Sequence, residues 1–267
     1  MSRTDDTGLV GILATDRDAD LVPAALQHLG HALARIDGVA VDLVMSLRAV
    51  DRRAKMQAIA HAPRRLRRLD VEVGNYEAEW TGAHTSSTLD AVCRQRNEVV
   101  RRAREGGYAW LLFLDSDVML EETTLVRLLA ASGDVIHAPY RPRWAAQPIV
   151  GVPGNDADDV ELLVNPHLYE TSAPSFAAAV VAGGCTLLRR SAFDVPFEIA
   201  DLLTIRGEDI GFSRNALQRG LSIQCLSRHF VEHRCRAAST LLLPSIDDTR
   251  ALRLQQREVL LRMATQT

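Results

Sequence analysis

Hydrophobic and polar residues follow one another in blocks along the chain, and these blocks predict alternating strands and helices. Apolar runs at residues 9–14 and 39–47 predict two strands, and the helical spacing at 21–36 predicts a helix between them, capped by Asp20. A strand, a helix and a second strand in this order are typical of a parallel sheet. The chain therefore opens as an α/β protein.

The alternation of strands and helices continues downstream. The periodicity predicts a strand at 71–73, helices at 89–105 and 121–131, a strand at 135–138, a helix at 210–219 that Gly220 ends, and a last strand within 221–233. Residues 140–175 are interrupted by proline and predict a long, partly ordered insertion. The spacing at 246–263 predicts a C-terminal helix that packs or forms a dimer contact.

The apolar run at 110–114 ends abruptly in two carboxylates, Asp115 and Asp117. Such a run is typical of a buried parallel strand, whose carboxyl end is where open α/β sheets bind ligands. Side chains two residues apart point the same way on an extended backbone, so both carboxylates can converge on Mg²⁺ or Mn²⁺. Two solvated turn residues, or caps of the next helix, are the alternative reading.

Four motifs in order resemble nucleotide-sugar glycosyltransferases of the GT-A type, most closely family-2-like enzymes. They are the Arg-Asn-Glu-Val-Val segment at 96–100, the apolar run ending in Asp-Ser-Asp at 111–117, the Gly-Gly segment at 180–190 and the Glu-Asp segment at 206–212. The resemblance covers roughly residues 9–235. It implies a mixed, mostly parallel sheet flanked by helices in a single domain, with a donor half at about 1–139, an acceptor half at 140–240 and a helical tail at 241–267.

The resemblance also implies a reaction. A metal-dependent enzyme would move a sugar from a UDP- or GDP-linked donor to an acceptor hydroxyl, with Mn²⁺ or Mg²⁺ neutralising the leaving diphosphate. Asp209 would act as the general base and invert the anomeric centre, while Glu208 would position it or bind the acceptor. A purely structural reading gives both carboxylates only a favourable place at a helix N-terminus.

The resemblance assigns the remaining roles residue by residue. The metal ligands would be Asp117 directly, Asp115 through water or the ribose, and His233, whose alternative is a structural histidine. The donor site would be formed by Ala14, Thr15 and Asp16 at the nucleobase, Arg94 and Arg96 at phosphate, and Asn97, Asp115, Ser116 and Asp117. Gly183 and Gly184 would lie on the acceptor side, where part of the 140–175 insertion would border the pocket or act as a lid.

Composition and charge narrow the partners. The chain has 267 residues, 47% of them hydrophobic, and carries 31 basic and 34 acidic residues for a net charge of −3. This balance predicts no general attraction to nucleic acid or to an anionic membrane. Neither a signal peptide nor an apolar stretch long enough to span a membrane is apparent, and four scattered cysteines suit reduced thiols, so we expect a cytoplasmic protein.

Two further patterns in the sequence could bind phosphate or a metal ion. The basic residues 64–68 could contact phosphate, but the solvated face of a helix with Leu66 and Leu69 turned inward is the favoured reading. Cys225, His229, His233 and Cys235 offer zinc ligands, although one straight strand would spread them too far apart to surround one ion.

Two other functions stay open at this point. A sugar-phosphate nucleotidylyltransferase also uses an α/β sheet, carboxylates and Mg²⁺, but residues 11–16 lack the Gly-rich, basic phosphate loop that such enzymes usually carry after the first strand. A non-catalytic nucleotide-sugar-binding protein on the same scaffold would bind without turnover.

Overall fold

The computed structural model describes residues 7–48, 50–74, 86–140, 150–153, 160–163, 172–202 and 205–234. An eight-stranded sheet runs through them in the order β3-β2-β1-β4-β10-β6-β13-β9. In that order the strands are Arg68–Gly74, Ala40–Arg48, Thr7–Leu13, Trp110–Asp115, Cys185–Arg189, Val135–His137, Ile223–Leu226 and Ser175–Ala177. The strands are mutually parallel except β10 and β9, which run antiparallel to their neighbours. The predicted mixed, mostly parallel sheet is confirmed.

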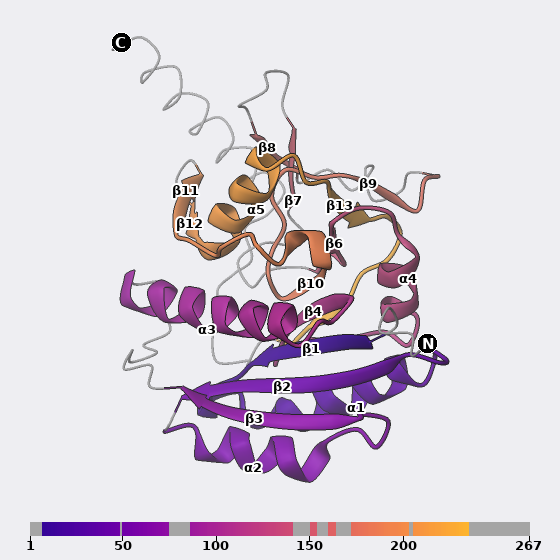
Figure 1. The fold of residues 1–267 in the computed structure, drawn as a ribbon, viewed down its shortest axis with the longest axis vertical. Coiled ribbons are helices and arrows are strands. Elements are labelled where there is room, and N and C mark those ends of the chain that lie inside the picture. The colour runs from indigo at the N-terminus through magenta and orange to yellow at the C-terminus, as the bar shows by residue number, and fades with distance from the viewer. Residues whose placement is uncertain are drawn as a thin grey trace.

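Helices cover both faces of this sheet (Figure 1). They are α1 (Val22–Leu33), α2 (Arg52–His61), α3 (Ser86–Glu105), α4 (Thr124–Ala130) and α5 (Glu208–Gln218), with short 3-10 turns at Asp16–Asp18 and Arg190–Ala192. One core packs α1, α2 and α4 against the sheet, and a second core packs α3 and α5 against the other face.

Strand β4 shows why the apolar run is continuous. Trp110, Leu112 and Leu114 belong to the first core, whereas Leu111 and Phe113 belong to the second. Because both faces of the strand are covered, every position from 110 to 114 is buried and the polar half of the usual alternation is missing. The strand ends where the first carboxylate, Asp115, reaches the sheet edge.

Three two-stranded sheets complete the described fold. β5 (Val118–Met119) pairs with β14 (Glu232–His233), β7 (Val150–Pro153) pairs with β8 (Val160–Leu163), and β11 (Ala200–Leu202) pairs with β12 (Ile205–Gly207). The β7–β8 hairpin lies inside the proline-interrupted region, for which the sequence predicted no strands. Strands of two to four residues carry too little alternation to be recognised.

Within the described residues the predicted helices and strands are otherwise confirmed to within a few residues, with three corrections. Asp20 does not cap α1, which begins after Leu21 without a side-chain cap; Asp20 pairs instead with Arg53 at 2.5 Å. Helix α4 begins at Thr124, later than predicted. Leu66 packs inward as expected, but α2 has already ended at His61, so that Leu66 lies outside any helix.

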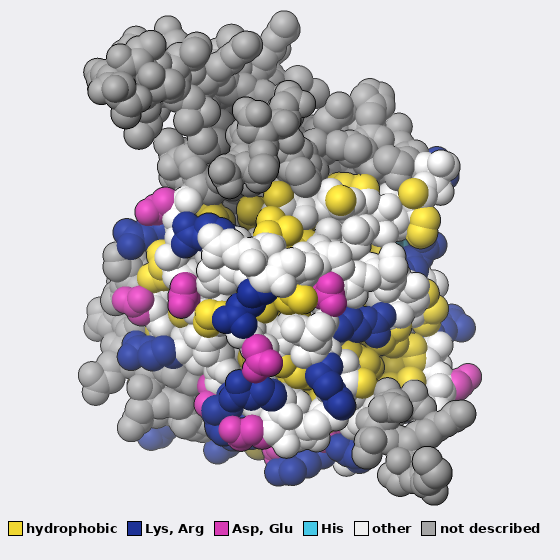
Figure 2. Space-filling model, turned by 45° about the horizontal axis from the view of Figure 1, so that its top comes forward, with side chains coloured by type: hydrophobic (Ala, Val, Ile, Leu, Met, Phe, Trp, Pro, Cys, Tyr) yellow, Lys and Arg dark blue, Asp and Glu magenta, His cyan; other side chains and the backbone are white. Residues whose placement is uncertain are grey.

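The surface matches the near-neutral composition. Figure 2 shows basic and acidic side chains interspersed over the visible face of the described residues, without a continuous field of one sign. None of the described helices is long and apolar enough to cross a membrane. The division into two halves and the dimer contact stay predictions, and the C-terminal tail and Cys235 lie outside the described residues.

Candidate active site

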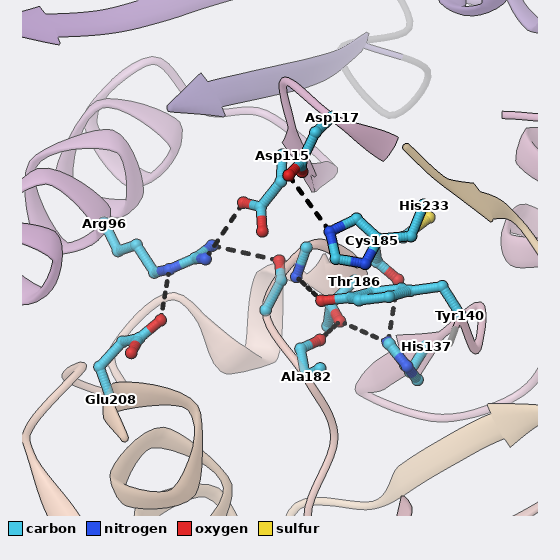
Figure 3. A network of polar contacts seen from close by, with 12 residues as sticks. Arg96, Asp115, Asp117, His137, Tyr140, Ala182, Cys185, Thr186, Glu208 and His233 are labelled. Atoms are coloured by element: carbon cyan, nitrogen blue, oxygen red, sulfur yellow. Dashed lines mark hydrogen bonds and ion pairs between the residues drawn. The ribbon is translucent and has the colours of Figure 1, made fainter. Parts of the chain in front are cut away.

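The two carboxylates after β4 lie at the carboxyl edge of the parallel strands. Asp115 ends β4 with about a third of its side chain exposed (34%), and Asp117 follows it with 9% exposed. Strand β14 pairs with β5 immediately after this turn and brings His233 beside Asp117, with Nε2 of His233 3.2 Å from Oδ2 of Asp117. The structure therefore brings two of the three predicted metal ligands, Asp117 and His233, into contact from distant parts of the chain, with Asp115 two residues before Asp117 (Figure 3).

Arg96 of α3 lies at the centre of the next group of contacts. Its side chain is 4% exposed, and Figure 3 shows it between Asp115 and Glu208. Nη2 lies 3.3 Å from Oδ1 of Asp115, and Nε lies 3.2 Å from Oε1 of Glu208. Nη1 donates to the carbonyl of Gly183 at 3.1 Å. This guanidinium thus connects the end of β4 with the start of α5.

The Gly183–Gly184 step allows the close approach of these side chains. Strand β10 runs antiparallel to β4, so its beginning rather than its end faces the active edge, and the amide of Asp115 donates to the carbonyl of Gly184 at 2.8 Å. A Cβ on Gly183 would lie 2.7 Å from the Arg96 guanidinium, and one on Gly184 would lie 2.6 Å from Oδ2 of Asp115. Larger residues at either position would displace the cluster.

Tyr140, which the sequence did not single out, also belongs to the site, where it contacts Gly184 and His233. Its hydroxyl accepts from the amide of Gly184 at 3.1 Å, and its ring packs edge-on against His137 and His233, with ring centres 5.7 and 5.2 Å apart. Burial raises the pKa of the Tyr140 phenol well above its usual value, and the nearby Asp115 adds to the shift. The phenol therefore stays protonated and can donate to a carboxylate.

Glu208 and Asp209 form the first turn of α5, as the Glu-Asp motif predicted. Glu208 forms an ion pair with Arg96, whereas the carboxylate of Asp209 accepts backbone amides, among them that of Ile210 at 2.9 Å. Burial, reinforced by the charge of Glu208, raises the pKa of Asp209 to about 7. Asp209 is therefore a carboxylate poised to exchange a proton near neutral pH.

Two predicted donor-site residues lie elsewhere. Asn97 is a backbone clamp: its Nδ2 donates to the carbonyl of Phe197 at 2.9 Å, and its Oδ1 accepts the amide of Phe197 at 2.8 Å. Arg94 is exposed and lines an open cavity of about 450 Å³ together with Asn97 and Cys93. One N–H and the oxygen of the Asn97 side chain bond to the backbone of Phe197, and the contact of Asn97 with a donor stays a prediction.

The end of β1 shows how the predicted nucleobase residues are held. Oδ1 of Asp16 accepts the amide of Ala54 at the start of α2, at 2.9 Å, and the amide of Asp16 donates to Asp51 at 3.0 Å. The Thr15 hydroxyl donates to Asp18, and Ala14 is buried beside β2, its amide bonded to Ser46. Ser116 is also buried, between the two site aspartates.

Sequence reasoning missed the Arg48–Asp51 pair beside these residues. Asp51 is 2% exposed and meets the Arg48 guanidinium at 2.8 Å. Although burial favours its neutral form, the bonds from Arg48 and from two backbone amides hold the pKa of Asp51 below its usual value. The sequence signal for this pair was Asp51 itself, an aspartate a few residues beyond the apolar strand that ends at Arg48.

The donor set suits a hard divalent cation, although the described residues contain no ready-made cluster of three such ligands around one point. Four carboxylates surround the single positive charge of Arg96. Arg96 interacts electrostatically with Asp115, Glu208 and Asp209, and Asp115 interacts in the same way with Asp117. Burial raises the pKa of Asp115, which Arg96 partly offsets. Carboxylate oxygens with one imidazole are ligands that Mn²⁺ accepts, so the residues present fit such an ion.

The zinc alternative is not supported by its described members. Cys225 lies buried in β13, His229 bonds to the Thr124 hydroxyl at 2.8 Å, and His233 faces Asp117. These side chains point to different surroundings. The basic residues 64–68 are likewise remote from the site: Arg67 pairs with Asp42 at the amino-terminal end of β2, opposite the active edge.

Comparison with known proteins identifies the fold. No family model and no curated protein matches the chain. Among solved structures, S. aureus TarS 1-349 in complex with UDP-GlcNAc aligns at 14% identity with a TM-score of 0.52, over 93% of this chain and 65% of that one. GalNAc-T7 with UDP, GalNAc and Mn²⁺ aligns at 13% identity with a TM-score of 0.57, over 89% of this chain and 45% of that one.

This chain spans 60% of the length of another solved form of TarS 1-349, which it matches with a TM-score of 0.51 and 15% identity over 85% of its own residues. At sequence identities of 13 to 15%, the structural likeness shows the fold alone. The arrangement of sheet and helices and these structural matches together show that the chain has the GT-A fold, the fold it shares with TarS and GalNAc-T7.

Proposed function

We propose that the protein is a metal-dependent glycosyltransferase that moves a sugar from a nucleoside-diphosphate sugar to an acceptor hydroxyl. One observation carries the proposal: on a GT-A fold, the Asp115–Asp117–His233 group and the Glu208–Asp209 turn face one site from either side of Arg96. Donor binding is then assigned to the residues after β4 and in β14, and proton removal to the first turn of α5.

The donor side would use Asp117, Asp115 and His233 to hold Mn²⁺ or Mg²⁺. When bound, such an ion neutralises the charge that develops on a leaving diphosphate. The GalNAc-T7 match contains UDP and Mn²⁺, and the TarS match contains UDP-GlcNAc, which supports a UDP-linked donor as the first to test. Asp16, Asp51 and the end of β1 would border the nucleobase.

The acceptor side would use Asp209 as general base. A carboxylate with a pKa near 7 takes a proton from a hydroxyl more readily than an ordinary aspartate does, yet is still ionised at slightly alkaline pH. Glu208 is held by Arg96 and would position this turn rather than accept the proton. If Asp209 lies opposite the leaving group, the transfer inverts the anomeric centre.

Incubation with a panel of nucleotide sugars and Mn²⁺ tests the proposal. We expect release of a nucleoside diphosphate that depends on the cation and increases when a suitable acceptor is added. Release of pyrophosphate from a nucleoside triphosphate and a sugar phosphate would identify a nucleotidylyltransferase instead. Cation-dependent nucleotide binding without any product across acceptor pools would identify a binding protein.

A further inference from the structure

Arg96 is a buried cation whose three guanidinium nitrogens each contact a protein oxygen. The oxygens belong to Asp115, Gly183 and Glu208, at 3.1 to 3.3 Å. We propose that Arg96 is a positioning residue that fixes Glu208, and with it the α5 turn bearing Asp209, relative to the end of β4. This inference rests on the proposed function and replaces the predicted phosphate contact of Arg96.

Aromatic packing also holds the guanidinium in place. Its central carbon lies 5.1 Å from the centre of the Phe113 ring and 5.6 Å from that of Phe197, distances typical of cation–π contacts. Phe197 in turn stacks on Phe212 of α5, with ring centres 4.3 Å apart. Helix α5 is thus connected to Arg96 by an ion pair and by a chain of rings.

The division of contacts gives the two adjacent carboxylates different tasks. Glu208 gives one oxygen to Arg96 and is 13% exposed, so its orientation is fixed. Asp209 lies within electrostatic reach of Arg96, whose charge opposes the burial-driven rise of the pKa of Asp209. Loss of Arg96 should therefore both loosen the turn and make Asp209 harder to ionise.

The test compares Arg96→Met and Arg96→Lys with Arg101→Met, a control on the same helix. Arg101 is exposed and pairs only with Glu98 and Glu105 among the described residues. Nucleoside diphosphate release is measured from about pH 5.5 to 9, and donor affinity is measured by calorimetry with Mn²⁺. For Arg96→Met we expect turnover to fall about 10² -fold, the loss typical of a catalytic group displaced by an ångström.

Two readouts distinguish positioning from a merely structural role. The rising limb of the pH–rate profile should move to higher pH in Arg96→Met, and donor affinity should fall far less than turnover does. Arg96→Lys should keep the pH midpoint but not the full rate, because an ammonium retains the charge without the fixed fork of donors. Methylguanidinium added to Arg96→Ala should restore part of the rate, while Arg101→Met should match the wild type throughout.

A loss of donor affinity equal to the loss of turnover would make Arg96 a donor contact and overturn the inference. So would an unchanged rate and midpoint. If the wild type releases no nucleoside diphosphate, the proposed function itself fails. Thermal unfolding of Arg96→Lys, Glu208→Gln and the double variant then tests whether Arg96 and Glu208 are coupled in the folded protein. Non-additive shifts of the unfolding midpoint support the link, and additive shifts refute it.

Discussion

Proton exchange at Asp209 links the chemistry of the site to pH. The group is ionised only above a pKa of about 7, which burial and the charge of Glu208 produce. A general base works in its ionised form, so the transfer rate should rise as pH increases through about 7 and then level off. Asp209→Asn should bind donor and cation normally while transfer at pH 8 falls by roughly 10²- to 10⁴-fold, and its difference from the wild type should shrink as pH falls below about 7.

Donor affinity measured beside the transfer rate checks this expectation. A matched loss of donor affinity and of rate would place Asp209 on the donor side or in the folding of α5. A pH–rate profile without a rise near neutral pH would assign the proton to another group.

Removal of one anionic ligand should weaken the cation site. Asp117→Asn replaces a carboxylate with an amide of almost the same shape, so the Mn²⁺-dependent part of UDP binding should largely disappear while the fold persists. His233→Ala should cause a milder loss of the same kind.

Asp37→Asn is the matched control, since Asp37 is exposed and pairs only with Arg65 among the described residues. Calorimetric titration of UDP and GDP, with and without Mn²⁺, measures these differences, and unchanged metal dependence in Asp117→Asn would refute the assignment.

A methyl group at Gly184 should displace Asp115 and Tyr140. It would lie 2.5 Å from the Tyr140 hydroxyl and 2.6 Å from Asp115, closer than real contacts allow. Gly184→Ala should therefore reduce cation-dependent nucleotide binding, whereas Gly30→Ala, where the nearest atom is Pro63 Cβ at 3.5 Å, should be tolerated or slightly stabilising in helix α1. Equal nucleotide affinities in the two variants would show that the close approach at Gly184 is unimportant.

At the scale of elements, α3 is held to the segment before β11 by the clamp between Asn97 and Phe197. Asn97→Ala removes two hydrogen bonds from a part-buried backbone and should lower the free energy of unfolding by about 1–3 kcal/mol. Turnover should fall as well, because Phe197 packs on Arg96. Chemical denaturation gives the first quantity. Normal stability together with weakened donor binding would support the donor contact that the sequence predicted.

The sequence is informative about elements in proportion to their length. The apolar run of β4 and the amphipathic face of α3 were predictable, because each carries several periods of burial. The reversed direction of β10 was not, since an antiparallel strand buried on both faces reads like a parallel one. Strands β5 and β14 have two residues each and form only because they pair with each other.

The site follows the same rule. Asp115 and Asp117 were predictable because they follow a long apolar strand, whereas the Glu208–Asp209 turn was singled out by its resemblance to a family motif. Tyr140 was not, because its contacts with Gly184 and His233 join positions far apart in the chain. Arg96 was singled out, but its partners on β4 and α5 become visible only when the sheet edge is assembled.

At the scale of the whole molecule, the burial of Asp209 beside a second carboxylate should cost stability at neutral and alkaline pH. The folded pKa of Asp209 is raised from 3.8 to about 7, so the folded state binds the proton more tightly than the unfolded chain does. The stabilisation is complete below about pH 4 and is lost as pH rises through about 7. Asp209→Asn cannot ionise, so it should unfold at a higher temperature than the wild type at pH 8 and at about the same temperature at pH 4.

Thermal unfolding without added cation, recorded at both pH values, measures this difference. An equal shift at the two pH values would show that the substitution acts through packing rather than through charge.

The position of β4 has a consequence for the order in which the protein can assemble. One neighbour, β1, lies near the start of the chain, and the other, β10, lies beyond residue 184. Both pairings are distant in sequence, and distant pairings form slowly. During synthesis, the carboxylates after β4 are made before Gly184, Glu208 and His233. The nascent chain can therefore complete its first parallel strands early, while the chemistry must wait for almost the last described residue.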